Sequence, residues 1–257
     1  MARAAAQILD PTRWTHRIEG RSSATGRVRL DVDQGSLDVA IKEFPARSFR
    51  ARLDRWWRGD TRAERAWNAA MALTEAGIPT PEPILVLSPD GEPDGRSSFF
   101  VARHLEGAIE FRRLVDALRR RRPDPGLANL DVEGTIRALG GFVRSLHRAG
   151  IWHRDLTAGN LLLWPWPDPH PTVHVVDLDR TRIGRVIGRA IRVRELGRIP
   201  LFDPEHRRIL LEAYHQPAPV PWLDTALYQL HTRVFHFRGR LRVRGRRWVS
   251  RWTGSAK

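Results

Sequence analysis

The stretch that decides the fold is IWHRDLTAGNLLL, residues 151–163, followed by VHVVDLDR, residues 173–180. The segments Leu161–Trp164 and Val173–Val176 are rich in apolar residues and predict two short buried strands joined by a proline-rich turn. A strand pair of this kind holds the residues at its ends at a fixed separation. We therefore expect the chemistry at the polar residues that precede the first strand and follow the second.

The polar residues of this stretch suit a metal-dependent phosphotransferase. Asp155 can orient and deprotonate an acceptor hydroxyl. Asn160 offers Mg²⁺ a neutral oxygen, and Asp177, at the end of the next strand, offers a charged one. We expect Arg154 to steady the loop electrostatically and His153 to brace it by hydrogen bonding. Together these residues predict transfer of a phosphoryl group to a hydroxyl.

The first hundred residues predict an antiparallel sheet around one helix. Residues 27–32 and 37–44 alternate apolar with polar side chains and are joined by turn residues, which indicates a hairpin. Residues 61–76 carry small and apolar side chains at helical spacing. Residues 84–87 and 98–103 are short strand candidates. The chain therefore begins with a small lobe built on a sheet.

The second half predicts mainly helices. Residues 109–122 suit a helix with a basic end, and a longer helix beginning near Val132 is closed by Gly150. Arginine-rich helices follow Arg180. The fold class is therefore α+β, and the length allows one large domain or two tightly joined lobes. We divide the chain into an N-lobe at residues 1–103, a helical C-lobe at 104–232 and a basic C-terminal segment at 233–257.

Two motifs carry a resemblance to the protein-kinase superfamily. HRDLTAGN, residues 153–160, matches the catalytic-loop pattern H-R-D-x-x-x-x-N, and DLD, residues 177–179, stands where D-F-G is expected. VAIK, residues 39–42, resembles the strand whose lysine holds the nucleotide phosphates. The resemblance implies a bilobal protein-kinase-like fold with ATP and Mg²⁺ as cofactors.

Strand alternation supports this assignment of residues 39–42. Ala40 and Lys42 share one face of the strand, so the small side chain of Ala40 can pack against an adenine while the Lys42 ammonium reaches the phosphates. Glu64, on the first helix, is expected to pair with Lys42 and orient it. Glu75 is the competing candidate, but it lies in the last turn, where the helix dipole disfavours a carboxylate.

The sequence departs from the protein-kinase pattern at three places. The expected phosphate-covering loop, residues 19–27, lacks G-x-G-x-x-G and offers a glycine and hydroxyl set instead: Gly20, Ser22, Ser23, Thr25 and Gly26. Asp179 replaces the D-F-G glycine, which argues against a flipping hinge, and is expected near the metal site or paired with Arg180 or Arg182. No A-P-E motif follows, so a peptide-docking activation segment is not expected.

These departures shift the expected acceptor away from a protein. HRDLTAGNLLL, DLDR and the run AERAWNAAMALTEAGIPTPEPI, residues 63–84, together resemble the lipopolysaccharide kinases that phosphorylate heptose or Kdo in the core oligosaccharide. The likeness spans residues 18–214 and implies transfer of the γ-phosphate of ATP to a sugar hydroxyl. The alternatives are an aminoglycoside-type small-molecule kinase, a Ser/Thr kinase, and a catalytically silent kinase fold that binds anionic lipid or nucleic acid.

Charge and composition set the expected surroundings. The formal net charge is +15, which favours a polyanionic partner. Arginines after the metal strand are expected at the acceptor mouth: Arg185, Arg189, Arg192, Arg194 and Arg198. The arginines and aromatics of residues 233–251 suit peripheral contact with an anionic inner membrane, and a disordered or nucleic-acid-binding tail is the open alternative for this segment. For the protein as a whole, no nucleic-acid partner is expected. With no cysteine, signal peptide or membrane span visible, we expect a cytoplasmic protein.

Overall fold

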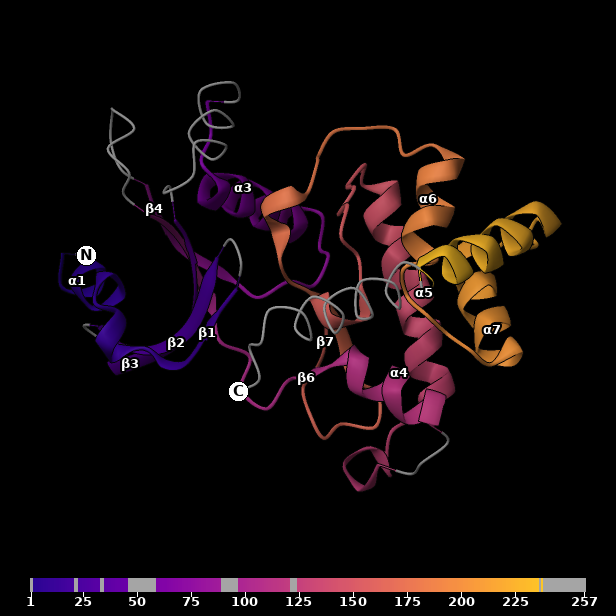
Figure 1. Cartoon of the computed structure of the whole chain (residues 1–257), viewed down its shortest axis with the longest axis horizontal. Helices are drawn as coiled ribbons and strands as arrows, with labels where there is room; N and C mark the ends of the chain where they lie inside the picture. Colours follow the sequence, from indigo (N-terminus) through magenta and orange to yellow (C-terminus); the bar gives the residue numbers. More distant parts are fainter. Residues whose placement is uncertain are drawn as a thin grey trace, which may run out of the picture.

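A computed structural model gives the fold as two lobes with the candidate motifs between them (Figure 1). A five-stranded sheet with one long helix forms the N-terminal lobe, and a mainly helical bundle with a small three-stranded sheet forms the C-terminal lobe. The α+β class and the sheet-then-helices order predicted from the sequence are confirmed. The structure describes residues 2–20, 23–32, 35–45, 59–88, 97–120, 124–235 and 237.

The N-terminal sheet is antiparallel throughout, with strand order β1-β2-β3-β5-β4. Its strands are β1 (Thr15–Glu19), β2 (Ala24–Val32), β3 (Gly35–Phe44), β4 (Pro83–Leu87) and β5 (Ser98–Arg103). The expected hairpin and both short strands are therefore confirmed. On β3, Val39 and Ile41 are buried in the sheet's own core, whereas Ala40 faces out of it, as strand alternation predicts.

An N-terminal helix that the sequence analysis did not foresee covers this sheet. Helix α1 (Ala2–Leu9) and the short 3-10 helix η1 (Pro11–Arg13) precede β1, and Ile8 is fully buried against the strands. Trp14 donates from its indole Nε1 to the Ile8 carbonyl at 3.0 Å. A Cβ on Gly26 would lie 2.7 Å from the Trp14 ring. Gly26 therefore gives room to a core tryptophan.

Helix α3 (Arg62–Glu75) joins the two lobes. Thr61 caps its N-terminus: the Thr61 hydroxyl accepts from the Glu64 N–H, and the Glu64 carboxylate accepts from the Thr61 N–H at 2.6 Å. The alanines of its inner face and Leu73 belong to the core of the C-terminal lobe. Their small side chains let the helix approach that lobe closely, which puts the first turn of α3 beside the DLD motif.

The C-terminal lobe is built around the long central helix α5 (Val132–Arg148). The other elements are β6 (Ile109–Glu110), α4 (Phe111–Arg120), η2 (Pro125–Leu127), η3 (Ala158–Asn160), β7 (Leu161–Trp164), β8 (Thr172–Val175), η4 (Leu178–Arg180), α6 (Arg189–Leu196), α7 (Pro204–His215) and a last helix at residues 222–235. Strands β6, β7 and β8 form the small antiparallel sheet. Within the described ranges, no helix has the length and hydropathy that crossing a membrane requires.

Close packing of α5 on α7 gives a stability prediction at two adjacent glycines. A Cβ on Gly140 would lie 2.6 Å from the Leu210 carbonyl oxygen and 2.7 Å from the Ala213 Cβ, whereas Gly141 has only the flexible Arg144 tip near it. Gly140→Ala should therefore lower the free energy of unfolding by about 1–3 kcal/mol. Gly141→Ala should raise it by about 1 kcal/mol through helix propensity. Urea unfolding measures both, and effects of the same sign would contradict this packing.

Candidate active site

A cavity of about 420 Å³ lies between the two lobes and is lined by both predicted metal ligands and by four of the predicted nucleotide residues, Ser23, Gly26, Ala40 and Lys42. The N-terminal lobe contributes Ala40 and Lys42 from β3, and the C-terminal lobe contributes Asn160 and Asp177. The lining also includes the apolar residues Phe100, Ala102, Leu162 and Val176 and the hydroxyl residues Ser23 and Thr25. The cavity thus pairs an apolar end, suited to a flat base, with a charged end.

At the charged end, Lys42 contacts both carboxylates of the DLD motif. Its ammonium donates to Asp177 and lies 3.2 Å from Asp179 Oδ1. Arg62, at the start of α3, donates to Asp179 Oδ2 from Nε at 2.9 Å and from Nη2 at 2.7 Å. The ring of Phe44 lies under both cations, 5.1 Å from the Lys42 ammonium and 4.7 Å from the Arg62 guanidinium. Asp179 therefore links α3 to β3.

The two carboxylates have opposite electrostatic environments. Burial raises the pKa of Asp177, and its hydrogen bond with Asp179 adds to this, against the opposing charge of Lys42. Burial also acts to raise the pKa of Asp179, but the hydrogen bond with Asp177 and the charges of Lys42 and Arg62 hold it well below its usual value. Asp179 is therefore the firmly ionised member of the pair.

The backbone of the catalytic-loop region is strained at two of these positions. Arg154 and Asp177 have φ of +69° and +66°, in the left-handed region that non-glycine residues rarely adopt. His153 is fully buried and bridges the two segments: its Nε2 lies 3.0 Å from the Val176 carbonyl oxygen, and its Nδ1 accepts from the Asp155 N–H at 3.3 Å. The expected bracing role of His153 is thus confirmed, and its two hydrogen bonds join the strained segments.

The carboxylate of Asp155 lies between two guanidinium groups. Arg198 donates to Asp155 Oδ1 at 3.1 Å and also to the Arg154 carbonyl oxygen. Arg180 Nη1 lies 3.6 Å from Asp155 Oδ2. Because the Asp155 side chain is about one-third exposed, at 34% relative accessibility, it remains reachable by an incoming hydroxyl. The groups that face the expected base are therefore Arg180 and Arg198.

Asn160 is oriented so that it can serve as an oxygen ligand. Its Nδ2 donates to the Asp155 carbonyl oxygen at 2.8 Å, which fixes the amide and leaves Oδ1 without that partner. In the described part of the chain, no cluster of three or more His, Cys, Asp or Glu residues could hold a metal. A donor set of Asn160 and Asp177 fits Mg²⁺, which is usually held by one or two protein oxygens together with phosphate and water.

A buried polar chain supports the catalytic loop from behind. Glu195 of α6 accepts from the Arg154 N–H at 2.6 Å through Oε1, and its Oε2 lies 3.1 Å from His147 Nε2. The other ring nitrogen of His147 is 2.8 Å from the Tyr214 hydroxyl oxygen. Burial raises the pKa of Tyr214 to about 12, so the phenol is neutral. Glu195 and His147 carried no recognisable sequence signal because their partners are 41 or more residues away.

Glu64 does not pair with Lys42, so this part of the sequence prediction is wrong. The described contacts of the Lys42 ammonium are with Asp177, Asp179 and the Phe44 ring. Glu64 is the third residue of its helix, and the capping box turns its carboxylate back toward Thr61. The T-x-x-E sequence at residues 61–64 is a recognisable signal for this geometry. On α3, Arg62 contacts the Asp179 carboxylate, and Arg65 donates to the Asp179 carbonyl oxygen at 3.4 Å.

Asp179 lies beside Asp177, as one of the two alternatives expected, but its described ion pairs are not with Arg180 or Arg182, and the arginines after it differ from expectation. Asp179 pairs with Lys42 and Arg62, whereas Arg180 faces Asp155. The five arginines expected at one acceptor mouth are dispersed. Of these, Arg198 contacts Asp155, Arg189 and Arg192 line a different cavity, and Arg194 lies over the Trp152 ring.

The remaining predicted site residues are partly accounted for. The Arg154 guanidinium lies 5.4 Å from the Trp152 ring centroid, and the Arg154 backbone is held by Glu195 and Arg198. Gly20 lies in a turn, in which its N–H donates to the Ser23 carbonyl oxygen at 2.8 Å. The expected phosphate loop is shorter than predicted, since β2 already begins at Ala24. Ser22 and most of the basic segment at 233–257 lie outside the described residues.

The fold and the arrangement of the motifs define a protein-kinase-like class. Within it, the chain belongs to the lipopolysaccharide kinase (Kdo/WaaP) family, whose model matches residues 10–202. Among solved structures it is similar to "WaaP in complex with acyl carrier protein", with a TM-score of 0.61 and 20% identity over 87% of each chain. Matches extend to 1049 solved chains, so the fold alone does not select a substrate. No curated protein matches the sequence.

Proposed function

We propose that this chain is an ATP-dependent kinase that transfers the γ-phosphate to a sugar hydroxyl of the lipopolysaccharide core, on Kdo or heptose. The observation that carries the proposal is that Lys42, Asn160 and Asp177 line one cavity in a member of the lipopolysaccharide kinase family, and that Asp155 lies next to it, its backbone carbonyl accepting from Asn160. A protein that only binds anions has no need of a base, a phosphate-binding lysine and two metal ligands together.

The nucleotide would occupy the cavity between the lobes. Ala40 and Ala102 leave space for adenine beside Phe100 and Leu162, and Lys42 would leave Asp177 to hold the phosphates. Asn160 Oδ1 and the Asp177 carboxylate would hold Mg²⁺, which neutralises charge on the phosphate oxygens when it is bound. Asp179, held by Arg62, would keep Lys42 at the correct end of the cavity.

Asp155 would receive the proton of the attacking hydroxyl. The acceptor oxygen then bonds to the γ-phosphorus while the bond to the bridging oxygen of the nucleoside diphosphate breaks. Arg180 and Arg198 flank the Asp155 carboxylate and are suited to the carboxylate of Kdo or to a phosphate on a core sugar. Binding of such an anion would draw the guanidiniums from Asp155 and free it to accept the proton.

Arg62 gives a prediction that separates this arrangement from the usual lysine–glutamate pair. Arg62→Ala should lower phosphoryl transfer about 10–100-fold, the usual cost of removing a partner that orients a metal-site residue. The Michaelis constant for ATP should rise, because Lys42 would then be held more tightly by Asp179. Arg62→Lys should recover part of the loss by restoring the charge without the planar fork. Equal activity of both variants and the native chain would refute this role.

The acceptor class is tested with γ-labelled ATP and three acceptors: core glycolipid stripped of its core phosphates, an aminoglycoside, and a basic protein. Glycolipid labelling that depends on Mg²⁺ is expected. Labelling of the aminoglycoside alone would replace the proposal with a soluble-substrate kinase, and labelling of the protein alone with a Ser/Thr kinase. Absence of label in every acceptor, with bound nucleotide, would favour a silent binder.

A further inference from the structure

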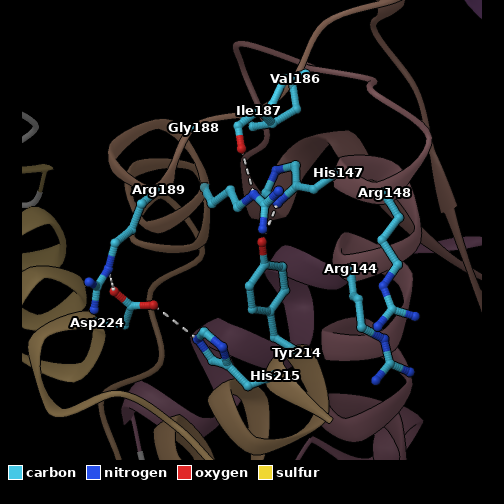
Figure 2. Close-up of a pocket in the computed structure, with 11 residues that line it drawn as sticks. Arg144, His147, Arg148, Val186, Ile187, Gly188, Arg189, Tyr214, His215 and Asp224 are labelled. Carbon is cyan, nitrogen blue, oxygen red and sulfur yellow. Dashed lines mark hydrogen bonds and ion pairs between the residues drawn. The ribbon is translucent and has the colours of Figure 1, made fainter. Parts of the chain in front are cut away.

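A second cavity, of about 520 Å³, lies on the helical lobe and shares no lining residue with the nucleotide cavity (Figure 2). It is enclosed by the last turn of α5, the segment at residues 186–192 and the C-terminal end of α7. In Figure 2, Arg144 and Arg148 lie on one side, Arg189 and Asp224 on the other, and Tyr214 stands between them. Neither the motifs nor the family match assigns a function to this cavity.

The cavity has a strong excess of positive charge. Four of its lining residues are arginines, and Asp224 is the one acidic side chain among the lining residues the structure describes. Asp224 is already paired with Arg189 at 2.5 Å. In the described ranges, no carboxylate pairs with Arg144, Arg148 or Arg192: Arg144 and Arg192 donate to the backbone carbonyls of Gln216 and Ile187 instead. Neutral carbonyls do not cancel these charges.

The neutral walls add hydrogen-bonding groups in fixed positions. The Tyr214 hydroxyl faces the cavity and is held by His147, which is itself held by buried Glu195 (Figure 2). Burial and the neighbouring arginines lower the pKa of His215, against the charge of Asp224. His215 Nε2 is a buried atom that lies 3.2 Å from Asp224 Oδ2 without hydrogen-bond geometry, so it lacks a hydrogen-bond partner. Side chains that are already held in place lose little conformational entropy when a ligand binds.

We propose that this cavity is a binding site for a small ligand bearing two or more phosphate groups. Three guanidiniums without acidic partners favour a ligand that carries several negative charges, and planar guanidinium forks match phosphate oxygens. The volume lies in the range of small-molecule sites and accommodates a sugar bisphosphate. The site is separate from the proposed catalytic reaction and does not rest on the proposed function.

Calorimetric titration with two probes, pyrophosphate and glucose 1,6-bisphosphate, tests the site. The titration uses the full chain carrying Lys42→Met, which removes the ammonium of the nucleotide cavity, at constant ionic strength. The cavity variant adds Arg148→Gln and Arg192→Gln. A matched control adds Arg13→Gln and Arg137→Gln, which removes two exposed charges elsewhere, one of them on α5 itself. Glucose serves as the uncharged ligand control.

The cavity variant should bind at least about tenfold more weakly than its parent, because each charge-assisted hydrogen bond contributes about 1.5–3 kcal/mol. The control variant should retain the parent's affinity. Binding of both probes supports recognition of phosphate groups alone, and binding of the bisphosphate alone supports recognition of the sugar as well. An equal loss in both variants, or no saturable binding of either probe, would overturn the proposal.

The single variant Arg148→Gln tests whether misfolding explains the loss of affinity in the double variant. Arg148 makes no ion pair with any described residue, so its replacement should leave the melting temperature of the ligand-free chain unchanged. Its affinity for the bisphosphate should still fall by at least about threefold, a part of the loss in the double variant. Unchanged affinity in a folded Arg148→Gln chain would contradict the site.

Discussion

Asp155→Asn is expected to lower the rate of phosphoryl transfer about 10²–10⁴-fold, the range in which a positioned general base contributes. The substitution keeps the shape of the side chain and its neighbours Arg180 and Arg198, but it replaces the basic carboxylate that accepts the proton with a neutral amide. Nucleotide affinity should change little, because Asp155 is absent from the lining of the nucleotide cavity. Initial rates with γ-labelled ATP and core glycolipid measure the effect.

Asp168→Asn is the matched control for Asp155→Asn, since Asp168 is exposed in the turn between β7 and β8. It removes the same charge from the same lobe and should leave the rate within about twofold of the native value. Near-normal turnover in Asp155→Asn would show that another group takes the proton. A folded Asp155→Asn chain with lost nucleotide binding would also contradict the assignment, because it would make Asp155 a nucleotide ligand.

Asp177→Asn is expected to lower transfer by at least about 10²-fold, because a metal's stabilisation of charge in the transition state is worth several kcal/mol. The melting temperature should not fall along with the activity. Burial raises the pKa of Asp177, so the fold disfavours its ionised form, and a neutral amide should leave the melting temperature at pH 7 unchanged or higher. Loss of activity with retained stability is typical of a functional carboxylate.

Asp179→Asn provides the contrast within the same motif. The pKa of Asp179 is lowered in the fold, so its ionised form contributes stability that is present above the unfolded pKa and is lost as pH falls through the folded value. Asp179→Asn should therefore lower the melting temperature at pH 7, where Asp177→Asn does not. Differential scanning calorimetry of the two variants checks the sign. The opposite order of melting temperatures would contradict the assigned ion pairs.

The sequence was sufficient for those features that depend on local pattern. The limits of β5 and β7 agree with the expected strands, and the shared face of Ala40 and Lys42 follows from the two-residue period of a strand. The H-R-D-x-x-x-x-N and DLD motifs located the site because their order and spacing are fixed by the hairpin between them. These are contacts between residues that are close in sequence or joined by one turn.

Features that depend on packing between distant elements were not accessible from the sequence. The Arg62–Asp179 pair joins residues 117 apart, and it exists because α3 packs its alanine face on the other lobe. Arginines close in sequence around α6 separate in space, because a helix turns successive side chains to different faces. Glu64 was misassigned for a different reason: the local capping box competes with a long-range pair, and it was visible in the sequence.

Binding of Mg²⁺ and nucleotide in the cavity between the lobes is the claim on which the proposed function depends. Thermal unfolding with a non-hydrolysable ATP analogue, with and without Mg²⁺, tests it directly, since a ligand that binds only the folded state raises the melting temperature. The account predicts a saturable increase that requires Mg²⁺ in the native chain and is absent in Asp177→Asn. No increase at millimolar ligand, or the same increase in both chains, would contradict it.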